Sequence, residues 1–123
     1  MTAWNVSRET EERLRAFSDL VLKWTPRINL IAKSTQDQIW QRHVLDSLQV
    51  ARAGYACKHW VDIGSGGGFP GLVVAIHARE HWPDTRFTLI ESDQRKCTFL
   101  RTTIRELSLN ATVLTRRIEE APP

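Results

Sequence analysis

Cysteine is scarce in this chain, and long apolar runs are absent. The two cysteines, Cys57 and Cys97, do not form a CxxC pair, which argues against a disulfide framework and a four-cysteine zinc site. No window approaches the roughly 18 to 20 apolar residues that cross a bilayer, and residues 1–9 lack the basic and apolar stretches of a signal peptide. We therefore expect a soluble, cytoplasmic protein that binds neither a membrane nor a structural metal.

Length and charge set further bounds. A chain of 123 residues with 41% hydrophobic content can bury one core. The formal charge of +3 fits a polyanionic ligand, although many soluble proteins have this balance without binding nucleic acid. Charge alone therefore does not select a partner.

The first part of the chain predicts two helices. Apolar residues at spacings of three and four, ending at Trp24, indicate an amphipathic helix, which we expect to stop before Pro26. Thr35, with Gln38 three residues later, has the pattern of a capping box for a second helix. Residues 1–56 are thus predicted to form an N-terminal helical cap.

From about residue 57 the pattern alternates between strands and helices. Short β-rich segments occur at 60–63, 87–90 and 112–115, and helical segments follow the first two. Such alternation predicts parallel strands joined by right-handed crossovers. The expected fold class is α/β, with an incomplete doubly wound, Rossmann-like sheet over residues 57–123.

Five of the six glycines lie between positions 64 and 71. Where a strand turns into a helix, glycine permits positive φ and lets a ligand approach the main chain. The spacing Gly64-x-Gly66-x-Gly68 fits the loop of an S-adenosylmethionine-dependent methyltransferase. A dinucleotide fingerprint starting at Gly64 would need its third glycine at Phe69. We therefore favour a methyltransferase over a NAD-dependent oxidoreductase or a glycine turn without a ligand.

Two carboxylates flank this loop in the predicted fold. Glu91 stands at the expected end of the second strand, where its carboxylate can accept hydrogen bonds from both ribose hydroxyls of an adenosine-containing cofactor. That role would be the same for S-adenosylmethionine and NAD. Asp62 precedes the loop and either orients its amides or the amino-acid end of the cofactor, or simply caps the turn.

Several motifs together resemble one enzyme family. They are Asn29-Leu30, the string RHVLDSL at 42–48, the string DIGSGGGFPG at 62–71, and RIEE at 117–120. With these motifs the chain resembles the bacterial RsmG (GidB) family, which methylates N7 of a guanine in 16S ribosomal RNA. The resemblance implies S-adenosyl-L-methionine as cofactor and 16S ribosomal RNA or the small ribosomal subunit as partner.

The resemblance also implies roles for single residues. Gly64 and Phe69 would line the cofactor pocket, Glu91 would hold the ribose, and Ile118 with Glu119 would meet the adenine. Two departures stand out: Ile31 replaces the family's common threonine, and the chain ends well before the family does, so we expect a fragment. The full predicted cofactor-binding set is Asp62, Gly64, Ser65, Gly66, Gly68, Phe69, Glu91, Ile118 and Glu119.

The implied chemistry needs no general base, because guanine N7 attacks through a lone pair and has no proton to lose. We therefore assign no catalytic residue and expect positioning to dominate. His43, Asp46 and Ser47 would share one helical turn. They either face the methyl end of the cofactor or the RNA, or form a hydrogen-bonded packing cluster.

Other charged and metal-binding residue types have simpler interpretations. His77 and His81 are four apart, a spacing that can bind zinc, but the HExxH motif is absent and we expect surface histidines.

A fragment that binds cofactor or RNA without turnover is the second functional hypothesis. Cations toward the C-terminus either contact RNA phosphates or form a solvated face; they are Arg95, Lys96, Arg101, Arg105, Arg116 and Arg117.

Overall fold

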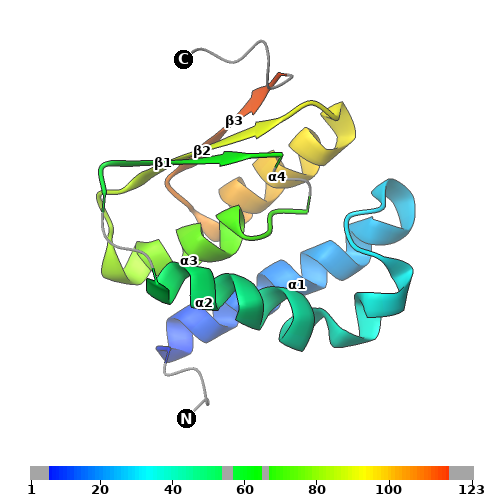
Figure 1. Ribbon diagram of the computed structural model, residues 1–123, viewed down its shortest axis with the longest axis horizontal. Coiled ribbons are helices and arrows are strands. Elements are labelled where there is room, and N and C mark those ends of the chain that lie inside the picture. The colour runs from blue at the N-terminus through cyan, green and yellow to red at the C-terminus, as the bar shows by residue number, and fades with distance from the viewer. Residues whose placement is uncertain (1–5, 54–56, 65–66, 117–123) are drawn as a thin grey trace.

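The computed structural model describes residues 6–53, 57–64 and 67–116. It contains a three-stranded sheet with helices stacked against it (Figure 1). In chain order the elements are α1 (Arg8–Ile28), η1 (Lys33–Gln38), η2 (Ile39–Val44), α2 (Leu45–Ala53), β1 (His59–Ile63), α3 (Gly71–His81), β2 (Arg86–Glu91), α4 (Gln94–Leu107) and β3 (Ala111–Thr115).

The three strands are parallel and lie in the order β1-β2-β3. All three strands predicted at 60–63, 87–90 and 112–115 are confirmed, and each is longer than predicted by one or two residues. Because the chain advances across the sheet in one direction, right-handed crossovers place α3 and α4 on the same face. Figure 1 shows all the α-helices on that side of the sheet. This is the arrangement expected of an incomplete doubly wound fold.

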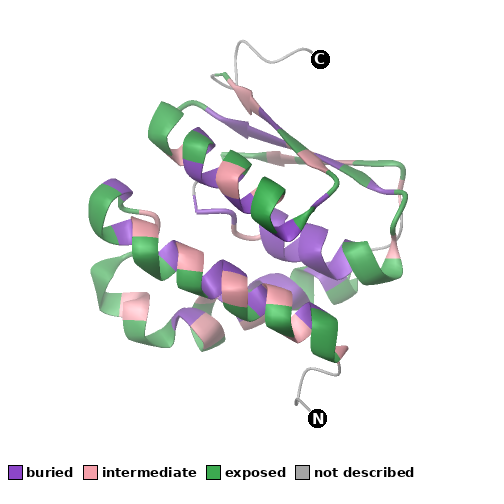
Figure 2. Ribbon diagram, turned by 180° about the vertical axis from the view of Figure 1, so that it is seen from behind, coloured by how far each residue is buried: buried purple, intermediate pink, exposed green. Residues whose placement is uncertain are grey.

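Helix α3 forms the centre of the core. Its residues from Gly71 to Ala78 are all buried, and α3 contacts α1, α2 and β2. A helix surrounded on all sides needs apolar residues all round rather than on one stripe, which explains the run LVVAI at 72–76. Figure 2 shows this helix as the most continuously buried element. One hydrophobic cluster joins the cap to the sheet, and the boundary at residues 56–57 stays a prediction.

The expected end of the first helix is wrong. Helix α1 continues through Pro26 to Ile28 and ends at Asn29, which has a φ of +57° and donates its N–H to the Thr25 carbonyl. Proline removes one helical hydrogen bond, to the carbonyl of Leu22. Pro26 and Leu22 are both exposed, so water can satisfy that carbonyl and the helix continues for a last turn.

The capping box predicted at Thr35 is also wrong. Thr35 lies inside the 3₁₀ helix η1, and its hydroxyl donates 2.9 Å back to the Ala32 carbonyl instead of accepting from a following amide. A threonine hydroxyl that bonds to a preceding carbonyl favours a local turn over a helix start. The segment then passes through the π-helix η2 before α2 begins. None of the described helices is long and apolar enough to cross a membrane.

Candidate functional site

The glycine segment connects the carboxyl end of β1 to the start of α3. Gly64 has a φ of +70° and Gly68 a φ of +90°, a region that disfavours residues with a Cβ. A side chain added at Gly64 would meet nothing within 4 Å. The main chain at Gly64 therefore faces open space, which a ligand can approach. The predicted residues Ser65 and Gly66 lie outside the described residues.

Gly71 is glycine for a different reason, namely close packing. A Cβ at this position would overlap the Oδ2 atom of Asp62 and lie 2.8 Å from a methyl group of Leu89. The missing side chain lets α3 begin directly against β1 and β2. It also places the Asp62 carboxylate beside the first residue of α3, where helix amides favour negative charge.

Glu91 ends β2 at the same edge of the sheet. Its side chain is buried at 8% exposure, and its Oε2 atom accepts a 3.0 Å hydrogen bond from the Asp93 amide. The register pairs Ile63 with Ile90, and the Gly64 amide donates 2.7 Å to the Ile90 carbonyl. Gly64 and Glu91 thus lie at the same end of two paired strands, and their shared role in a cofactor site stays a prediction.

The third strand ends beside this carboxylate. Thr115 is the register partner of Glu91, and the Arg116 amide donates 3.0 Å to the Glu91 carbonyl. Ile118 and Glu119, predicted at the adenine, lie outside the described residues.

Phe69 connects the loop to the helical cap. Its ring lies 5.0 Å from that of Phe17 in α1 and 5.1 Å from the His43 imidazole in η2, centroid to centroid. The His43 Nε2 atom lies 3.1 Å from the Thr35 hydroxyl. Burial lowers the pKa of His43 below 6.5, with Asp46 raising it and Arg42 lowering it. His43 therefore lies against the loop, largely uncharged at neutral pH.

The other two residues of the predicted helical cluster differ from each other in burial. Asp46 is exposed, whereas Ser47 is buried at 5% exposure. The π-helix η2 was not predicted, and its wider turn changes the angle between side chains around His43. Sequence patterns of apolar spacing carry no signal for a π-helix, because the pattern on either side is still helical.

The prediction of surface histidines is right for His81 and wrong for His77. His81 is exposed, but His77 is buried at 8% exposure and its Nδ1 atom has no hydrogen-bond partner among the described residues. Burial first, then the charges of His81 and Arg52, lower its pKa to about 4. His77 is buried, contrary to the prediction, because the sheet and the cap enclose α3. In residues 6–53, 57–64 and 67–116, no three metal-binding side chains gather.

This arrangement defines a class of protein. A positive-φ glycine loop follows the first parallel strand, an acidic residue ends the second, and a buried helix starts at the loop, which together give a Rossmann-like methyltransferase fold. The chain belongs to the rRNA small subunit methyltransferase G family, whose family model matches residues 10–123.

Similar proteins carry the same name. A "Ribosomal RNA small subunit methyltransferase G" from Ruegeria sp. (strain TM1040) is 55% identical over 96% of this chain. Namesakes from Ruegeria pomeroyi and Cereibacter sphaeroides (strain ATCC 17029) are 54% and 57% identical, each over 97% of the chain. The chain spans 58% of the length of each of these relatives.

Proposed function

We propose that this chain provides the cofactor-binding half of an S-adenosylmethionine-dependent methyltransferase acting on guanine N7 of 16S ribosomal RNA. The atom N7 and the position, guanosine 527, are what the resemblance to the RsmG family implies. The observation that carries the proposal is the open main chain of Gly64, hydrogen-bonded to Ile90, the residue that precedes the buried Glu91. The family and the names of the relatives supply the ribosomal RNA. A cytoplasmic location follows from that substrate.

The residues fit the cofactor. Open space at Gly64 leaves room for the ligand against the backbone, and the N-terminus of α3 favours its carboxylate. The Glu91 carboxylate can accept hydrogen bonds from ribose hydroxyls in addition to that from Asp93. We propose the same cofactor-binding residues as the sequence predicts, including Ser65, Gly66, Ile118 and Glu119.

The bound cofactor would supply an activated methyl group. Since guanine N7 needs no deprotonation, the chain's own residues act by holding and orienting, which contributes on the order of 7 to 11 kcal/mol in favourable cases. Of the His43, Asp46 and Ser47 set, His43 is held against Phe69 of the loop and against Thr35. We propose that it faces the methyl end of the site or the RNA.

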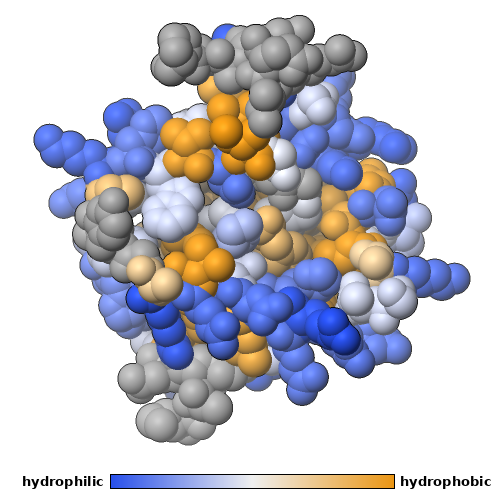
Figure 3. Space-filling model, viewed as in Figure 1, coloured by the Kyte–Doolittle hydropathy of each residue, from blue (hydrophilic) through white to orange (hydrophobic). Residues whose placement is uncertain are grey.

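A binding function without turnover is the second candidate, and one observation favours it. Strand β1 is hydrogen-bonded on one side only within the described sheet, and its Val61 and Ile63 are 49% and 53% exposed. Figure 3 shows apolar surface in the region of β1. Such an edge and face offer no wall for a substrate. Methylation of unmodified small subunits by the 123-residue chain would refute this candidate.

The proposal is tested by calorimetric titration of the chain with S-adenosylhomocysteine, beside NADH. We expect saturable binding of S-adenosylhomocysteine only, abolished by the paired changes Gly64→Asp and Gly66→Asp. Circular dichroism of the variant is the control for folding. Binding of NADH alone would favour an oxidoreductase, and no binding by a folded chain would overturn the cofactor assignment.

A further inference from the structure

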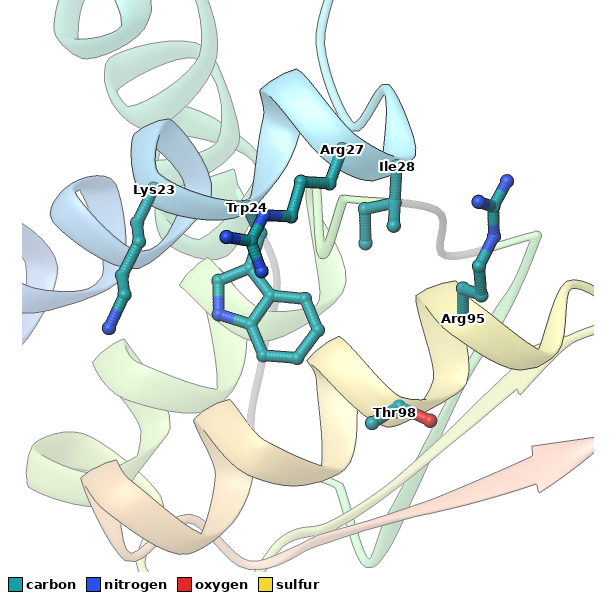
Figure 4. A pocket seen from close by; sticks show the side chains of 6 residues that line it. All are labelled: Lys23, Trp24, Arg27, Ile28, Arg95 and Thr98. Carbon is teal, nitrogen blue, oxygen red and sulfur yellow. The ribbon is translucent and has the colours of Figure 1, made fainter.

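A groove lies between the last turns of α1 and the first two turns of α4 (Figure 4). Its cavity measures about 480 Å³, within the range of roughly 300 to 1,000 Å³ typical of small-ligand sites. Nothing in the proposed cofactor site uses it. It is lined by Lys23, Trp24, Arg27, Ile28, Arg95 and Thr98.

One wall of the groove is aromatic. The Trp24 indole lies 5.6 Å from the Phe99 ring, edge-on, and Ile28 continues the apolar surface. Trp24 is only half-buried, so part of its ring faces the groove, as Figure 4 shows. A fixed, partly exposed indole is a stacking surface for a planar base.

The rim of the groove is cationic. Lys23, Arg27 and Arg95 are exposed, and none of them takes part in an ion pair within the described residues. The nearby carboxylate of Asp93 caps α4, accepting from the Arg95 and Lys96 amides. Three cations around an aromatic wall complement a polyanion that carries flat rings.

Both sides of the groove lead to the glycine loop. Beyond Ile28, the carbonyl of Leu30 lies 3.0 Å from where a Cβ of Gly67 would stand. On the other side, Arg95 follows Glu91 by four residues, at the carboxyl edge of the sheet. An extended ligand bound along the groove would therefore reach the carboxyl ends of the strands, where the proposed cofactor binds.

We propose that this groove binds a single-stranded segment of the RNA substrate, with one base stacked on Trp24 and phosphates at Lys23, Arg27 and Arg95. The proposal rests on the proposed function, which supplies the RNA, and extends it by naming where the strand lies. An acidic protein segment would match the cations but would have no use for the indole face.

The test measures fluorescence anisotropy of a short, labelled single-stranded RNA with the sequence around the target guanine, over a series of salt concentrations. Trp24→Leu should weaken binding roughly 5- to 150-fold with an unchanged salt slope. The pair Lys23→Gln and Arg27→Gln should reduce the slope of log K against log salt by about 1.4, or about 0.7 per lost phosphate contact.

The matched control is the pair Lys58→Gln and Arg86→Gln, which removes the same charge at the amino ends of β1 and β2, and it should leave binding nearly unchanged. The proposal for the groove would be overturned if both charge pairs lost RNA affinity equally, or if Trp24→Leu kept full affinity. It would also be overturned if polyglutamate competed as well as RNA, or if no RNA bound. S-adenosylhomocysteine titration of the same samples separates the two proposals. If S-adenosylhomocysteine binds while RNA binding is unaffected by the groove variants, only this inference fails. If it does not bind while RNA still needs Trp24, only the cofactor assignment fails.

Discussion

The His43 imidazole and the Phe69 ring lie 5.1 Å apart, which joins the helical cap to the glycine loop. The two residues belong to separate motifs, 26 positions apart in the chain. The cap therefore packs against the loop and supports it, and substitutions in η2 should alter the packing of the loop.

That contact should give a measurable coupling. In a double-mutant cycle with His43→Ala and Phe69→Leu, we expect about 0.5 to 1.5 kcal/mol of interaction in the free energy of unfolding, because paired rings gain that much beyond burial. Urea unfolding of the four proteins measures it. Phe69→Leu combined with His59→Ala, at the opposite end of β1, is the control and should be additive. Additivity in the His43 cycle as well would contradict the contact.

Gly71 should be intolerant of a side chain because of Asp62. We expect Gly71→Ala to lower the free energy of unfolding by about 1 to 3 kcal/mol through overpacking. In an Asp62→Ala background the same change should cost less, since the overlapping carboxylate is gone and only Leu89 remains. Denaturant titrations of the four proteins give the comparison. An unchanged cost in the second background would show that Asp62 is not the obstacle.

Glu91→Gln should weaken S-adenosylhomocysteine about tenfold while the chain stays folded. The amide oxygen of glutamine can still accept from the Asp93 N–H, whereas hydrogen bonds from ribose lose their charge assistance, worth about 1 to 1.5 kcal/mol. Calorimetry measures the change. Glu106→Gln, which removes an exposed carboxylate on α4, is the matched control. Unaltered affinity in Glu91→Gln would remove Glu91 from the site.

Burial of neutral His77 should make stability depend on pH. Its pKa is about 4 in the folded chain, below the ordinary 6.5, so the unfolded chain binds a proton first as pH falls. The stabilisation is present above pH 6.5 and is lost between about 6.5 and 4, by up to about 3 kcal/mol. Urea unfolding at several pH values should show a shallower dependence for His77→Leu. An identical slope in His77→Leu and in the parent chain would contradict this role of His77.

Much of the fold was predictable from local patterns. The three strands, the α/β class and the position of Glu91 follow from β-rich runs, glycine clustering and the order of elements, because parallel pairing brings the carboxyl ends of strands to one edge. The ends of the cap helices were less predictable. Pro26 is tolerated because it faces solvent, and the Thr35 hydroxyl donates to the preceding carbonyl of Ala32. Neither orientation can be predicted from the linear sequence pattern.

The amino-acid order alone specifies the glycine loop, its strand-to-helix setting and the family motifs, since these depend on residues close together in the chain. Packing of distant segments establishes the rest. It buries His77 inside α3, seats Phe69 between Phe17 and His43, and sets Trp24 opposite Arg95 across a groove. Such contacts arise from which helix faces meet when the cap closes on the sheet, and burial and charge pairing take their values only at that point.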